Sequence, residues 1–189
     1  MKYGDELKLK GFISWQPSTW PEPPAVYSTG FAETLAIIIK ETTLDEIENV
    51  ISDAQVVNGG LEHRGHVVAL ALLCAVDSVA AYAFDGGVGS RYTKFIATFF
   101  PSDYQPFADS IYKLFRNSSV HSWNLFEVGI WPRNEPIIEG NGSISFGLLN
   151  FSQALKQAVG NFLSTLPKDT NLQINSLSRY SGLKASAIA

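Results

Sequence analysis

The 189-residue sequence has little of several residue types that define common functional classes. It holds one cysteine, Cys74, and three histidines. A single cysteine cannot form a disulfide within the chain, and one thiolate alone cannot build a structural zinc site. Cys74 lies in the apolar stretch Leu-Leu-Cys-Ala-Val, which predicts a buried structural cysteine. Nothing in the cysteine count calls for an oxidising compartment.

Charged residues are also few. They make up 17% of the chain, and the net charge is −4. A protein that grips long duplexes through many phosphates is usually basic, so any nucleic-acid contact is expected to be a local basic site rather than a basic face. The hydrophobic fraction of 46% is enough for a substantial core and too high for a disordered chain.

Targeting and membrane signals are weak. The first ten residues have neither an apolar core nor a cleavage pattern, so no signal peptide is expected. The one long apolar run, Val67–Phe84, contains Asp77 and Ser78 and is at the lower length limit for a membrane span. A buried core helix is the preferred interpretation, which predicts a cytoplasmic protein without membrane contact.

The chain divides into three parts. Residues 1–30 are expected to form an irregular arm packed on the body, because residues 15–24 hold four prolines and two tryptophans. Residues 31–170 are expected to form one helical domain. Residues 171–189 read as a polar tail that is partly ordered at best.

Helical periodicity and helix-breaking residues divide the domain further. Thr43 and Glu46 form a capping-box pattern, which predicts a helix start at this point. Residues 136–148 predict a β-hairpin with Gly-Asn-Gly at its turn. The other helices are expected over about 62–84, over 91–100 with Ser90 as cap, from 107 to roughly 122, and over 151–166. The expected fold class is mainly α, a helical bundle with one small β-hairpin.

One short pattern near the end of the helix from 107 to 122 can carry chemistry. Asn117 and His121 are four residues apart and share a helix face, which Arg116 flanks. A histidine can take or give a proton near neutral pH, an arginine can hold phosphate oxygens as charge builds up, and an asparagine can orient either group. This set suits phosphodiester cleavage. The competing interpretation is pure capping, because Arg and His also complement the dipole at a helix C-terminus.

The segment resembles the Arg-x4–6-His motif of HEPN domains, in the form with a polar residue directly after the arginine. A wider resemblance to uncharacterised bacterial HEPN-like proteins covers roughly residues 60–170, through Ala69–Tyr82, Phe95, Phe100–Tyr104 and Ile111–His121.

The resemblance implies a helical bundle, a homodimer whose two motifs face each other across a cleft, and a metal-independent endoribonuclease that needs no cofactor. Catalysis would fall to Arg116, Asn117 and His121, with Asp77 and Tyr112 in support. RNA is the implied substrate, and an antitoxin-like or other protein is the implied partner.

Asp77 also stands out on physical grounds. An acid in the middle of an apolar helix is costly unless it is paired. It could orient Arg116 or His121 from a neighbouring helix, or it could accept a hydrogen bond from a backbone amide or a tyrosine. An Asp–Arg pair would serve the structure equally well.

Other catalytic patterns are missing from the sequence. There is no His-Glu-x-x-His and no Gly-x-Ser-x-Gly, and Ser118 and Ser119 beside His121 have no visible triad partner. His63 and His66 are three residues apart but lack a matched third ligand, so no metal is expected. The alternative function is a non-catalytic helical module that binds a protein partner or a nucleotide, and whether the chain is an enzyme stays open.

Overall fold

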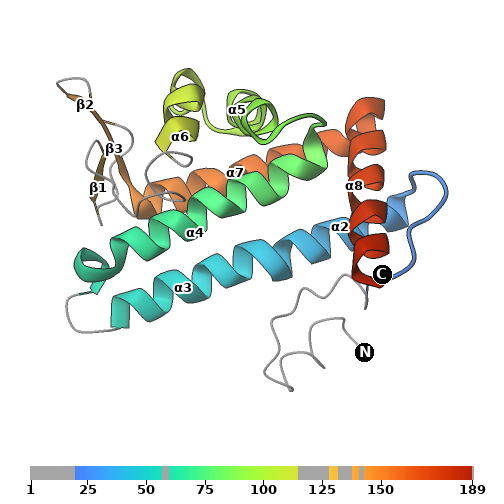
Figure 1. Ribbon diagram of the computed structural model, residues 1–189, viewed down its shortest axis with the longest axis horizontal. Coiled ribbons are helices and arrows are strands. Elements are labelled where there is room, and N and C mark those ends of the chain that lie inside the picture. Colours follow the sequence, from blue (N-terminus) through green and yellow to red (C-terminus); the bar gives the residue numbers. More distant parts are fainter. Residues whose placement is uncertain (1–19, 57–59, 115–127, 132–137, 141–142, 189) are drawn as a thin grey trace.

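The computed structural model describes residues 20–56, 60–114, 128–131, 138–140 and 143–188. In this part of the chain the structure is a bundle of helices around one long central helix, α4 (Figure 1). The prediction of a mainly α helical bundle is confirmed. The α-helices are α2 Thr29–Ile39, α3 Asp45–Val56, α4 Gly60–Ala83, α5 Val88–Phe99, α6 Ala108–Leu114, α7 Leu148–Thr165 and α8 Thr170–Ile188. The shorter turns are the π-helix η2 Lys40–Leu44 and the 3₁₀ turns η3 Gln105–Phe107 and η5 Leu166–Lys168.

A small three-stranded sheet precedes α7. Strand β2, Ile138–Gly140, pairs antiparallel with β3, Ser143–Gly147. Strand β1, Val128–Trp131, was not expected from the sequence and pairs in parallel with the other edge of β3, giving the order β1-β3-β2. Residues 141–142, the expected turn, lie outside the described residues, so the hairpin over 136–148 stays a prediction.

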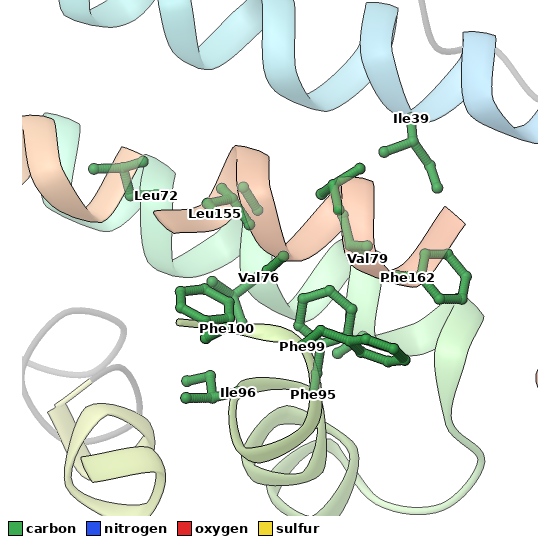
Figure 2. Close-up of a cluster of buried hydrophobic side chains, with 14 of the residues drawn as sticks. Ile39, Leu72, Val76, Val79, Phe95, Ile96, Phe99, Phe100, Leu155 and Phe162 are labelled. Carbon is green, nitrogen blue, oxygen red and sulfur yellow. The ribbon is translucent and has the colours of Figure 1, made fainter. Parts of the chain in front are cut away.

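The core lies where α4, α5 and α7 meet. Val76 of α4 and Phe95 of α5 are fully buried. Figure 2 shows the rings of Phe95, Phe99, Phe100 and Phe162 gathered against α4 and α7. The centroids of Phe95 and Phe99 are 5.3 Å apart, and those of Phe99 and Phe162 are 5.7 Å apart in an edge-on arrangement. Each such buried side chain stabilises the fold by roughly 1.5–3 kcal/mol, and tilted ring pairs are the favoured geometry.

The same apolar character makes α4 resemble a membrane span by length and composition alone. Residues Gly65–Ala83 have a mean hydropathy of 1.8, but 61% of the tested stretch is buried inside the bundle. The central helix of a soluble protein shows the same combination, so this finding is weak evidence for a span.

The expected helix start at Thr43 is wrong. The helical run is unbroken from Thr29 to Val56, and its N-cap is Ser28, whose Oγ accepts a hydrogen bond from the Phe31 amide at 3.1 Å. A capping box requires open backbone amides, and amides in the middle of a helical run are already paired.

The π-helix η2 explains why this long run stays amphipathic. In a regular α-helix the residue seven positions after Ile39, which is Glu46, would share its face. Instead Glu46 is exposed and Ile47 is buried. The wider turn takes up one extra residue, so the apolar stripes of α2 and α3 both face the core.

Ser90 is not the cap of α5 either. The helix begins at Val88 with Gly87 as its N-cap, so Ser90 lies within the first turn. The turn before it needs Gly86, which has a φ of +100°, a conformation that favours glycine.

The prediction of a polar, partly ordered C-terminal tail is wrong, because residues Thr170–Ile188 form α8. This helix packs against α4. Ser176 Oγ donates to the Tyr82 carbonyl at 3.0 Å, and Asn175 Nδ2 donates to the Ala83 carbonyl at 3.1 Å. The last carbonyls of a helix have no partner within it, so these polar side chains cap α4.

Further along, α8 holds the described part of the N-terminal arm. The Tyr180 hydroxyl donates to the Pro21 carbonyl at 2.7 Å, and its ring lies 5.3 Å from that of Trp20. The Lys184 ammonium donates to the Trp20 carbonyl and lies 3.2 Å from Glu22. We call these contacts of α8 with residues 20–22 and with the end of α4 the α8 anchor. Residues 20–22 of the arm therefore contact α8, while residues 1–19 lie outside the described residues.

Candidate functional site

The expected catalytic residues Arg116, Asn117 and His121 lie outside the described residues, so their placement stays a prediction. The helix that leads to them is α6, which ends at Leu114, two residues before Arg116. The two expected supporting residues, Asp77 and Tyr112, are both described, and the candidate site is defined by what surrounds them.

Asp77 of α4 pairs with Arg91 of α5. Arg91 Nε donates to Asp77 Oδ1 at 3.1 Å, and Nη2 lies 3.0 Å from Oδ1 and 3.3 Å from Oδ2. The side chains are 25% and 19% exposed, so the pair is shielded but not sealed from solvent. Several charge-assisted hydrogen bonds offset the cost of placing an acid on an apolar helix.

Among the described residues the partner of Asp77 is Arg91, rather than a backbone amide. Arg116 and His121 lie outside the described residues, so the orienting role of Asp77 toward them stays a prediction. One signal for Arg91 is present in the sequence. A short connection between two helices makes them antiparallel neighbours, which brings the end of α4 beside the start of α5.

Tyr92 of α5 joins the two supporting residues. It is fully buried, and its ring centroid lies 5.5 Å from that of Tyr112 on α6. Burial raises the pKa of Tyr92 well above 10.0, and the nearby Asp77 carboxylate and Cys74 add to the increase. Asp77 therefore acts on Tyr92 through its charge, while Tyr112 packs against its ring. We call Asp77, Arg91, Tyr92 and Tyr112 the Asp77 cluster.

The approach of α6 to α5 depends on Gly89. A Cβ atom at Gly89 would lie 2.9 Å from three atoms of the Tyr112 side chain, which is closer than real side chains come. The missing side chain leaves room for Tyr112 to lie over α5. The position of α6 is thus tied to the Asp77 cluster.

Cys74 is exposed on α4, so the expectation of a buried cysteine is wrong. Its apolar neighbours in sequence point to other faces of the helix, and Cys74 faces the side that the described residues leave uncovered. Desolvation by its surroundings raises the pKa of the thiol, and the charge of Asp77 raises it further. At neutral pH the thiol is protonated and therefore a weak nucleophile.

No metal centre is formed within the described residues: they contain no group of three or more His, Cys, Asp or Glu side chains that could hold an ion. His66 is exposed on α4. The side chain of His63, its suggested companion, lies outside what the structure describes.

Tyr92 in the Asp77 cluster and Cys74 beside it are both poor proton acceptors at neutral pH. The pKa of Tyr92 and that of Cys74 are both raised, so neither group loses its proton near neutral pH.

Comparison with known proteins assigns no family, because no family model, no curated protein and no solved structure matches the chain. Arguments about function therefore rest on the chain's own residues and their geometry.

Proposed function

We propose that this chain is a HEPN-like protein that binds single-stranded RNA and cleaves it as a homodimer without a metal ion. The catalytic residues in this proposal are Arg116, Asn117 and His121. The observation that carries it is the convergence of Asp77 and Tyr112 around Tyr92. These two residues come from helices far apart in sequence, and the second lies on the helix that leads into the motif.

The chemistry needs one proton relay and one cation. His121 takes the proton of a ribose 2′-hydroxyl, whose oxygen attacks the adjacent phosphorus. The bond from phosphorus to the 5′-oxygen breaks, that oxygen leaves with a proton, and a 2′,3′-cyclic phosphate remains. Arg116 stabilises the charge that builds up on the phosphoryl oxygens, and Asn117 orients the reacting groups. One motif provides half of a cleft, and the second protomer provides the other half.

In this proposal the Asp77 cluster supports the chemistry by fixing α6, the helix that precedes the motif in sequence. The Asp77–Arg91 pair joins α4 to α5, and Tyr112 packs over Gly89 to join α6 to α5. A net charge of −4 suits a local RNA site rather than an extended one.

The test is cleavage of mixed RNA by the purified protein in EDTA. We expect products that end in 2′,3′-cyclic phosphate, and we expect His121→Ala and Arg116→Ala to abolish their formation. His66→Ala is the matched control, because His66 is exposed on α4 and outside the motif. Folded, dimeric wild type that cleaves nothing would contradict the proposal, as would equal cleavage by His121→Ala.

A non-catalytic interaction module is the second candidate. The observation that favours it is the apolar surface of α4 that the described residues leave uncovered, where Val67 is 50% exposed and Cys74 is also exposed. Exposed apolar patches on a helix are typical of protein contacts. In this case an antitoxin-like or other protein would bind equally well to wild type and to His121→Ala.

A further inference from the structure

Two neighbouring cavities lie where α8 packs against α4, at the end of the bundle shown in Figure 1. The first has a volume of about 280 Å³ and is lined by Trp20, Tyr82 and Leu183 together with polar groups. The second has a volume of about 390 Å³ and reaches the turn between α4 and α5. Arg179 lines both cavities.

Arg179 is the cation available to a ligand here. Its side chain is exposed, and no carboxylate pairs with it within the described residues. Arg91 also lines the second cavity, but it is engaged by Asp77 at 3.0 Å. A guanidinium with free donors can bind a phosphate through two parallel hydrogen bonds.

The charge around Arg179 limits what the second cavity can take. Asp85 lines the same cavity, and its carboxylate accepts a hydrogen bond from the Gly86 amide at 2.7 Å. The positive charges of Arg179 and Arg91 are therefore balanced by the negative charges of Asp85 and Asp77. The net charge around the second cavity is close to zero before a ligand binds. One singly charged phosphodiester fits this balance better than a polyphosphate does.

The first cavity is mostly apolar and has a few polar groups in its wall. Trp20 and Tyr82 bring aromatic carbon to it, and the Ser78 and Thr43 side chains also line it. The buried Trp20 indole N–H has no hydrogen-bond partner among the described residues, which leaves a donor to be satisfied. Thr43 comes from the π-helix η2, and π turns occur frequently at functional sites. Aromatic and apolar walls with a few polar groups are typical of sites that hold a nucleobase.

We infer that the paired cavities bind one nucleotide unit of single-stranded RNA, with its phosphodiester on Arg179 and its base in the first cavity. The inference rests on the proposed function for the choice of RNA. It adds a substrate-binding site that is built from residues other than those of the motif and that shares Arg91 with the Asp77 cluster.

The test is binding of a fluorescent oligouridylate, followed by anisotropy in the His121→Ala background so that the probe stays intact. Arg179→Gln is expected to weaken binding by about tenfold, because one charge-assisted contact is lost. The dependence of log K on log salt should become shallower by about 0.7, the value for one phosphate contact on a single strand. Lys168→Gln is the control, an exposed cation outside both cavities that should leave affinity and salt slope near the parent values.

A second variant tests the base site without changing charge. Ser78 is exposed on α4 and lines the first cavity, so Ser78→Trp should fill the cavity and leave the fold intact. We expect weaker binding with an unchanged salt slope. 2′,3′-Cyclic uridine monophosphate should compete with the oligonucleotide, since it carries the same base and one phosphodiester charge.

The outcomes separate this inference from the proposed function. Absence of any RNA binding, or an Arg179→Gln variant with the same affinity and slope as Lys168→Gln, would overturn the inference. Unchanged binding by Ser78→Trp would overturn the base site. Wild type that binds through Arg179 but cleaves nothing would overturn the ribonuclease proposal and leave the binding site standing.

Discussion

The Asp77 cluster and the α8 anchor lie at different places along α4, and they pair their polar groups in different ways. In the cluster, two ionised side chains pair with each other and stay partly in contact with solvent. In the anchor, the side chains of Tyr180 and Lys184 donate to backbone carbonyls of residues 21 and 20, and Lys184 pairs in addition with the exposed Glu22. Polar residues on a helix thus belong to a candidate site in the Asp77 cluster, whereas in the α8 anchor they stabilise the packing of the chain. The nature of the partner tells the two apart.

The largest effect is expected in the anchor. Tyr180 is 1% exposed and contacts the rings of Trp20 and Phe31. Tyr180→Ala should lower the free energy of unfolding by about 3–5 kcal/mol, the range for deleting a buried aromatic side chain. Tyr180→Phe should cost only about 1 kcal/mol, because it removes one hydrogen bond. Urea denaturation measures both, and a Tyr180→Ala protein as stable as wild type would show that α8 is not a support.

A smaller loss of stability is expected in the cluster. Asp77→Ala leaves the shielded Arg91 guanidinium without its partner and should cost roughly 1–2 kcal/mol. In a double-mutant cycle with Arg91→Met, the second substitution should add little to the first. Glu48→Gln is the matched control: it breaks the more exposed Lys156–Glu48 pair and should cost at most about 1 kcal/mol. Additive effects of Asp77→Ala and Arg91→Met would mean that the cluster does not act as a unit.

The cluster should also respond to alkaline pH. Burial raises the pKa of Tyr92 well above 10.0, so the folded protein holds this proton more tightly than the unfolded chain does. The stability from the neutral phenol is therefore present below pH 10 and is lost as the pH rises further. Burial also raises the pKa of Tyr104, to about 12. The free energy of unfolding should fall above pH 10 in wild type and fall less steeply in Tyr92→Phe. Equal slopes for the two proteins would contradict this.

The smallest effect concerns Cys74, which lies beside the cluster. Because Asp77 raises the pKa of the thiol, Asp77→Asn should increase the rate of Cys74 alkylation near pH 8. A change of a few-fold is expected, since desolvation is the larger cause of the shift. The reaction is followed by mass spectrometry of the native protein, with the urea-unfolded protein as reference. An unchanged rate would show that the Asp77 charge does not reach the thiol.

Helix ends were predictable where a glycine or a proline interrupts the helix. The long helix expected over about 62–84 is found as α4, Gly60–Ala83, and the last helix expected over 151–166 is found as α7, Leu148–Thr165. The capping pattern at Thr43 failed because such a pattern shows where a helix can begin, not whether the previous one has ended. The cap predicted at Ser90 failed because α5 begins two residues earlier, at Val88. The C-terminal segment was mistaken for a tail because its polar residues have their partners on other elements.

Less of the candidate site could be predicted. The sequence showed that Asp77 needs a partner, but which arginine reaches it depends on how α4 and α5 pack. Tyr92 lies between the supporting residues Asp77 and Tyr112. Its only feature in the sequence was its position on an amphipathic helix, which did not indicate a role in the site.

The π-helix η2 has a consequence for how the length of this chain can vary. Loss of one residue from a regular helix turns everything after it by about 100°, which would take the apolar side of α3 out of the core. Loss of one residue within Lys40–Leu44 would instead leave Ile47 seven positions after Ile39, as a regular α-helix requires. The fold is therefore expected to tolerate the deletion of one residue within η2. Since Thr42 and Thr43 line the first cavity, that shortening would alter the cavity wall and leave the bundle in place.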